Sequence, residues 1–136
     1  MRGIRLVPYV RPLTNFKINN KLSTLCPLNF RGVFDEDSLP KFKSKPHYPW
    51  CIVVNTLKDT SQTVGHWVVI MFGNDGKGYY FDPLGEKPKH SHWIRYLRKY
   101  SLGKRWTFNK LKVQNDYSNL CGHLCILYIM DKMKYP

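Results

Sequence analysis

Three segments with the composition of β-strands occupy the middle of this chain. Cys51–Thr56 and His66–Phe72 are rich in apolar and β-branched residues, which is typical of buried strands. The glycine-rich segment Gly73–Gly78 contains Asn-Asp-Gly, which predicts a tight hairpin turn between His66–Phe72 and Tyr79–Leu84. We therefore expect an antiparallel pair of strands at the centre of the fold.

Helical and irregular segments surround this hairpin. Apolar residues at helical spacing predict helices over Ser91–Tyr100 and Cys121–Met133, and a fourth strand is expected over Trp106–Val113 between them. A short helix is expected near Pro12–Asn20, whereas prolines and turn residues make Cys26–Pro49 mostly loop with one helical turn. The pattern is typical of the α+β class, with a mostly antiparallel central sheet flanked by helices.

The chain length fits one domain with one hydrophobic core. Residues 1–136 are expected to form this single domain, and residues 1–24 are the candidate N-terminal arm. The two longest apolar runs, Trp67–Phe72 and the run that contains Cys125–Met130, have no more than seven residues, which is far too few to cross a membrane. The basic segment Met1–Pro8 lacks the apolar stretch of a signal peptide. We therefore expect an intracellular protein that is not secreted and has no membrane partner.

The cysteines are expected to be free thiols, because nothing in the sequence indicates secretion. There are four, at Cys26, Cys51, Cys121 and Cys125. Cys121, His123 and Cys125 could share a metal on one helix, but a second ligand pair at zinc-like spacing is missing. His90 and His92 are the only other close pair, and they lie in a basic segment. No metal site is therefore expected.

The formal net charge of +13 is large for a chain of this length and calls for an explanation. No acidic residue occurs between Lys87 and Lys112, and helical spacing places Arg95, Arg98 and Lys99 on one face of the predicted helix. One explanation is a solvated face that keeps the protein soluble. The other, which we favour, is a surface that binds the phosphates of a polyanion such as DNA without reading its bases. The candidate nucleic-acid-binding residues are Lys89, Arg95, Arg98, Lys99, Lys104 and Arg105.

Four residues together have the chemistry of a thiol peptidase. Cys121 opens a helix, where the positive end of the helix dipole favours a nucleophilic thiolate. His66 and Asp82 lie at similar distances from the hairpin turn, so they are expected to pair directly and to let the carboxylate orient the imidazole. Gln114 precedes the cysteine and could donate its amide to an oxyanion, alongside the Cys121 backbone N–H. Each residue alone has an ordinary structural explanation, but their joint occurrence favours catalysis.

These residues lie in motifs that resemble the adenain family, the adenovirus-type maturation cysteine proteases, which are related to the SUMO proteases. The motifs are Gly65-His66-Trp67, Tyr80-Phe81-Asp82-Pro83-Leu84-Gly85, and Gln114 followed after six residues by Cys121-Gly122. Phe30-Arg31-Gly32-Val33-Phe34, with Leu39-Pro40, and Val53-Val54-Asn55-Thr56 resemble the adenain-like proteases of Polinton-type transposons and adintoviruses. The resemblance covers roughly residues 25–130.

The resemblance implies a role for each residue and a fold of the adenain type, permuted relative to papain. By it, His66 is the general base, Asp82 its orienting carboxylate, Cys121 the nucleophile and Gln114 the oxyanion donor. Trp67 would pack beside the site and narrow the substrate channel. The adenovirus enzyme has glutamate where Asp82 stands, but the SUMO proteases have aspartate, so the triad is unaffected.

The resemblance implies a cysteine endopeptidase that cleaves viral or transposon-encoded virion precursor proteins after small residues, often glycine. An isopeptidase that removes ubiquitin or SUMO-like modifiers is the enzymatic alternative. A non-catalytic, basic DNA-binding or virion structural protein that keeps the fold is the other. The chemistry requires no cofactor, although double-stranded DNA, bound without sequence preference, could act as an activator. We expect the protein in the host nucleus or cytoplasm and in the virion.

Overall fold

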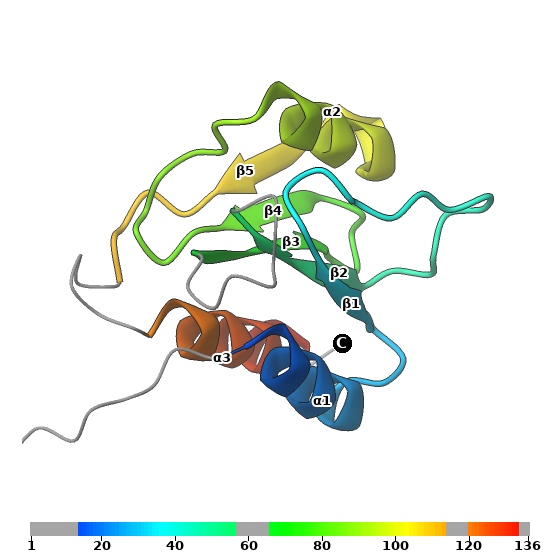
Figure 1. The fold of residues 1–136 in the computed structure, drawn as a ribbon. Helices are drawn as coiled ribbons and strands as arrows, with labels where there is room; N and C mark the ends of the chain where they lie inside the picture. The colour runs from blue at the N-terminus through cyan, green and yellow to red at the C-terminus, as the bar shows by residue number, and fades with distance from the viewer. Residues whose placement is uncertain (1–13, 57–65, 114–119, 134–136) are drawn as a thin grey trace, which may run out of the picture.

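The computed structural model describes residues 14–56, 66–113 and 120–133, and its elements confirm the α+β class (Figure 1). The helices and strands, in chain order, are α1 (Asn15–Leu25), β1 (Phe30–Phe34), β2 (Trp50–Asn55), β3 (Trp67–Phe72), β4 (Gly78–Phe81), α2 (Ser91–Tyr100), the 3₁₀ turn η1 (Leu102–Lys104), β5 (Trp106–Phe108) and α3 (Cys121–Met133). The predicted bounds of α2 and α3 are those observed.

The five strands form one mixed sheet in the order β1-β2-β3-β4-β5. The predicted hairpin is present, since β3 pairs antiparallel with β4 as well as with β2. The two edge strands differ from the expected antiparallel pattern, because β1 runs parallel to β2 and β5 runs parallel to β4. Parallel neighbours need a long crossover, which residues 35–49 provide at one edge and the segment containing α2 provides at the other.

The segment Cys26–Pro49 is mostly loop, as expected, but it contains strand β1 in place of the expected helical turn. The strand is short, and its pairing with β2 is irregular between Phe30 and Val33. Gly32 has a φ of +126°, a conformation that favours glycine. This irregularity and the prolines around the strand removed the regular alternation by which a strand is recognised. The third and fourth predicted strands are also shorter than expected, ending at Phe81 and Phe108.

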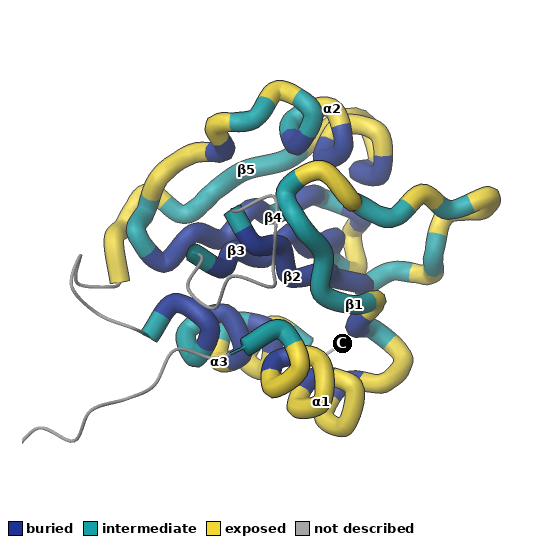
Figure 2. The backbone as a smooth tube through the Cα atoms, viewed as in Figure 1, coloured by how far each residue is buried: buried dark blue, intermediate teal, exposed yellow. Residues whose placement is uncertain are grey.

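Helices cover both faces of the sheet and create two cores, as Figure 2 shows in the buried central strands. One face packs against α1 and α3, and the other packs against the aromatic side of α2. Strands β2 and β3 are buried over their whole lengths, which explains their continuous apolar sequences. The single core expected from the chain length is therefore divided into two by the sheet.

Helix α1 makes residues 14–25 part of the packed structure rather than of an arm. The Thr14 hydroxyl accepts a hydrogen bond from the Lys17 amide at 3.2 Å and so caps the helix. Ile18 and Leu22, one turn apart, are fully buried against the sheet and α3. The remainder of the predicted arm, residues 1–13, lies outside the described residues.

Candidate active site

His66 and Asp82 meet at the end of the β3–β4 hairpin through their side chains. Nε2 of His66 and Oδ1 of Asp82 are 2.5 Å apart, so the imidazole N–H donates to the carboxylate. The sequence predicted that His66 and Asp82 lie directly across from each other, but the observed register is offset by two residues. Phe72 pairs with Gly78, and this register places Asp82 across from Val68. The side chains bridge this offset, and Nδ1 of His66 is left for a second partner.

The turn after β4 fixes the Asp82 side chain. Asp82-Pro83-Leu84-Gly85 has the sequence of a type I turn, and the Gly85 amide donates to the Asp82 carbonyl at 2.7 Å. The Leu84 amide donates to Asp82 Oδ1 at 2.8 Å. The carboxylate is 5% exposed. A buried carboxylate with two donors on one oxygen can hold an imidazole in a single orientation.

Asn109 holds the backbone of the same aspartate, and the sequence did not single it out. Its Oδ1 accepts from the Asp82 amide at 2.8 Å, and its Nδ2 donates to the Asp82 carbonyl at 2.6 Å. Asn109 directly follows β5, so its side chain continues the pairing of β5 with β4 by one residue. The sequence predicted Asn109 to lie inside the strand Trp106–Val113, and it gave no sign of the partner 27 residues away.

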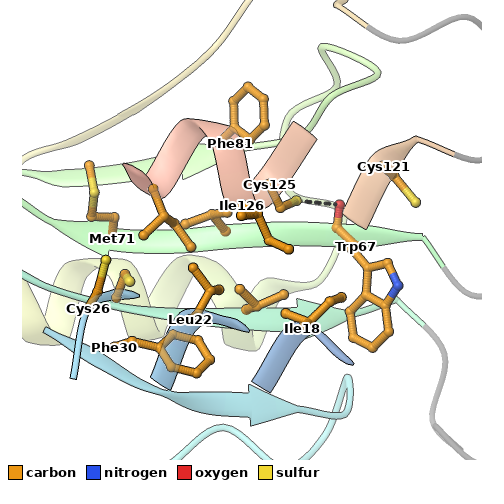
Figure 3. Packing of buried hydrophobic residues seen from close by; sticks show 14 residues of the cluster. Ile18, Leu22, Cys26, Phe30, Trp67, Met71, Phe81, Cys121, Cys125 and Ile126 are labelled. Carbon is orange, nitrogen blue, oxygen red and sulfur yellow. Dashed lines mark hydrogen bonds between the residues drawn. The ribbon is translucent and has the colours of Figure 1, made fainter. Parts of the chain in front are cut away.

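Cys121 reaches this pair from the other side, at the first residue of α3. The residue is 7% exposed and belongs to the core cluster between α3 and the sheet, as Figure 3 shows. Its thiol interacts with the His66 side chain and with the backbone of Trp67 and Gly122. The site is thus assembled from the end of a hairpin and the N-terminus of a helix.

The interaction between the thiol and the imidazole changes the acidity of both. Burial alone would lower the pKa of His66, but hydrogen bonds and charge attraction with Asp82 and Cys121 outweigh it and raise that pKa from 6.5 to about 9. Burial also raises the pKa of the Cys121 thiol, but hydrogen bonds to His66 and the Trp67 backbone and the charge of His66 outweigh it, so that the pKa is lowered. Both shifts favour a thiolate–imidazolium pair.

A family model described as Adenovirus endoprotease matches residues 30–136, well over half of the chain. The chain belongs to the adenovirus endoprotease family. No curated protein matches it. Membership makes the chain a cysteine protease of that family with protein substrates. His66, Asp82 and Cys121 all lie within the residues that match the adenovirus endoprotease family, whereas α1 precedes them.

Of two further predicted site residues, Trp67 is among the residues that the structure describes and Gln114 is not. Trp67 is 3% exposed, and its ring belongs to the core between the sheet and helices α1 and α3 (Figure 3). Alternation along β3 turns this side chain toward the helices, and the Trp67 backbone contacts the Cys121 thiol. The expected role of Trp67 in narrowing the substrate channel stays a prediction. Gln114 lies outside the described residues, so its role as oxyanion donor stays a prediction.

The other three thiols are chemically distinct from Cys121. All four cysteines are buried, and none of them forms a disulfide. Burial raises the pKa of Cys26, of Cys51 and, to well above its ordinary value, of Cys125. Cys125, one turn after Cys121, donates from Sγ to the Trp67 carbonyl at 3.2 Å. In this adenovirus endoprotease-family chain, only the thiol at the start of α3 is activated among the four.

The structure brings four of the six candidate nucleic-acid-binding residues together. Helix α2 is amphipathic as predicted, with Trp93, Tyr96, Leu97 and Tyr100 buried. Arg95, Arg98, Lys99 and Lys104 line one surface hollow beside it. Nζ of Lys89 instead lies 3.4 Å from Oε1 of Glu86. Arg105 is exposed and follows η1, but it does not line that hollow. The hollow is therefore lined by part of the acid-free segment only.

Two other features, a metal cluster and a membrane-spanning helix, are absent from the described residues. Within residues 14–56, 66–113 and 120–133, no group of three histidine, cysteine or acidic side chains could hold a metal ion. No helix in the described part of the chain is long and apolar enough to span a membrane.

Proposed function

We propose that Cys121, His66 and Asp82 are the catalytic triad of a cysteine endopeptidase. The observation that carries this proposal is the chain of interactions from Asp82 through His66 to Cys121, which raises the pKa of the imidazole and lowers that of the thiol. A cysteine that only filled the core at the start of a helix would need neither a lowered thiol pKa nor a neighbouring imidazole with a raised pKa. Membership of a cysteine protease family supports the same assignment.

The proposed reaction proceeds through a thioester. The Cys121 thiolate attacks the carbonyl carbon of the scissile peptide, forming a C–S bond and an oxyanion. The Cys121 backbone N–H and the side-chain amide of Gln114 stabilise that oxyanion. His66 gives its proton to the leaving nitrogen as the C–N bond breaks. A water molecule then attacks the thioester, His66 accepts its proton, and the thiolate leaves.

We propose virion precursor proteins as substrates, cleaved after small residues and often after glycine. The family and the resemblance of the motifs support this substrate class, and with it we propose the host nucleus or cytoplasm, and the virion, as the locations of the enzyme. Removal of a ubiquitin-like modifier is the alternative, because such modifiers end in two glycines. A non-catalytic structural role would not explain why the pKa of the Cys121 thiol is lowered.

A fluorogenic peptide with glycine before the reporter amine tests these proposals. The wild-type protein should release the reporter, and Cys121→Ala should abolish release. A peptide vinyl sulfone should label Cys121 ahead of the other three thiols, because only its pKa is lowered. Equal labelling of all four cysteines, or full activity of Cys121→Ala, would contradict the triad. Efficient cleavage of a ubiquitin-like precursor, with no cleavage of glycine-containing linear peptides, would favour the isopeptidase alternative.

We also propose that double-stranded DNA binds the surface formed by Arg95, Arg98, Lys99 and Lys104 and raises activity. The specific observation is that these four cations line one exposed hollow. DNA that binds both the enzyme and a basic substrate would raise their local concentration without any change in conformation. The chemistry itself needs no cofactor. Stimulation by duplex DNA at low salt, measured with a DNA-binding substrate and with the short peptide, separates this effect from direct activation.

A further inference from the structure

A groove of about 850 Å³ lies between α1 and α3, the two helices that cover one face of the sheet (Figure 1). Helix α1 contributes Lys17, Lys21 and Thr24, and α3 contributes His123 and Leu127, among others. On each helix these residues recur at intervals of three and four, so each helix presents one continuous stripe to the groove. We call this feature the α1–α3 groove.

The groove exposes apolar side chains that the fold itself does not use. Leu127 is 59% exposed, Leu25 is 45% exposed and Met130 is 37% exposed. The inner stripe of α3, which includes Cys125 and Ile129, already fills the core beneath the sheet. Helix α3 is therefore apolar on a second, outward face, which is unusual for a helix whose outer side meets solvent.

The charges around the groove indicate the kind of partner. Lys17 and Lys21 form its rim on α1, and no acidic residue is among the described residues that line it. The net charge of +13 adds a long-range attraction for acidic partners. The groove also contains the polar Asn20, Thr24 and His123, but Leu25, Ile126, Leu127 and Met130 line it with apolar side chains that suit an apolar partner surface better than a phosphate backbone. A cleft between two helices, lined by one stripe from each, matches the helix-in-groove mode of peptide recognition.

From these observations we propose that the α1–α3 groove binds an amphipathic helix of a protein partner. Its apolar residues, spaced i, i+4 and i+7, pack on Leu127 and Met130, and its acidic residues face Lys17 and Lys21. Helix α1 lies before residue 30, so one wall of the groove is outside the residues that match the adenovirus endoprotease family. The proposal does not depend on the peptidase activity proposed above.

A library of displayed peptides, each about 16 residues and so about four helical turns, tests the proposal. Selection is made on Cys121→Ala protein, which cannot cleave the peptides by the proposed mechanism. Enriched peptides should carry the apolar helical spacing together with Asp or Glu. Their affinity for a Leu127→Glu/Met130→Glu variant should fall by at least about tenfold, a difference of about 1.4 kcal/mol. Both positions are exposed, and an unchanged thermal midpoint checks that the variant is folded.

A charge exchange provides the matched control. Lys17→Glu/Lys21→Glu should weaken the selected peptides and should favour versions in which lysine replaces each acid. Lys43→Glu/Lys45→Glu changes the net charge equally on another exposed segment and should leave affinity within about twofold. Enrichment of basic or non-helical peptides, or equal binding by Leu127→Glu/Met130→Glu, would overturn the proposal. So would a wild-type dimer in sedimentation equilibrium that this variant abolishes, because the occupant would then be a second copy.

Discussion

At the scale of single residues, His66 and Cys121 each hold the other in its charged form. The pKa of His66 is raised to about 9, and that of Cys121 is lowered, so the thiolate–imidazolium pair exists between the two. We expect kcat/KM to fall as pH rises through about 9, where His66 loses the proton that the leaving nitrogen needs. It should also fall at low pH, where the thiolate is protonated.

Substitution of Asp82 tests the cause of this pH dependence. Asp82→Asn removes the negative charge that raises the pKa of His66, so the alkaline limb of the kcat/KM profile should move to lower pH. The loss of activity should be smaller than in His66→Ala, since a thiolate–imidazolium pair needs orientation more than charge relay. An alkaline limb that stays in place would show that Asp82 does not set the acidity of His66.

Gln114 carries the second prediction at this scale. Gln114→Ala should lower kcat by roughly 10²-fold, the usual effect of losing one oxyanion donor, with little change in KM. Steady-state kinetics on the fluorogenic peptide measures both constants. A main effect on KM would reassign Gln114 to substrate binding.

Asn109 is expected to act on catalysis through Asp82. Asn109→Ala removes both hydrogen bonds to the Asp82 backbone, so it should lower kcat by about tenfold or more, because small misplacements of catalytic groups are costly. It should also shift the alkaline limb, as Asp82→Asn does. Asn29→Ala is the control: Asn29 donates to the Pro49 carbonyl at 2.8 Å, away from the site. Both variants should lose about 1–2 kcal/mol of stability, but only the first should alter the pH profile.

At the scale of elements, the sequence correctly predicted those helices and strands whose positions depend on residues close together in the chain. The hairpin, α2 and α3 have strong turn signals or helical periodicity, and their positions were correct. Strand β1 and the two parallel edge pairings depend on distant partners, which no local pattern specifies. The residues of the candidate site divide in the same way. His66, Asp82 and Cys121 lie at the ends of elements that turn signals or helical periodicity predict. Asn109 and the buried position of Trp67 follow from tertiary packing.

Helix α2 carries the prediction at this scale. Arg95→Glu/Arg98→Glu/Lys99→Glu should flatten the salt dependence of duplex DNA binding, because fewer phosphates are neutralised and fewer counterions are released. Hydrolysis of the short peptide without DNA should be unchanged. As a control, Lys43→Glu/Lys45→Glu/Lys132→Glu changes the net charge equally at exposed positions elsewhere. Equal effects of both triple variants on fluorescence-anisotropy titrations would mean that net charge, not this surface, governs binding.

At the scale of the whole molecule, the sheet separates two cores with different consequences for the site. The core beneath α1 and α3 determines where α3 sits on the sheet, and so where Cys121 lies relative to His66. The aromatic core beneath α2 lies on the opposite face and contains none of the proposed triad. The position of the nucleophile should therefore respond to packing on one face more than on the other.

Two leucines allow this asymmetry to be measured with the same chemical change. Leu22, in the first core, and Leu97, in the second, are both fully buried. Leu22→Ala and Leu97→Ala should each lower the free energy of unfolding by about 2–5 kcal/mol, as buried leucine truncations do. At a temperature where both variants are folded, only Leu22→Ala should slow vinyl-sulfone labelling of Cys121, because it loosens the layer that carries α3. Equal slowing in both variants would show that the two cores act on the site as one rigid unit.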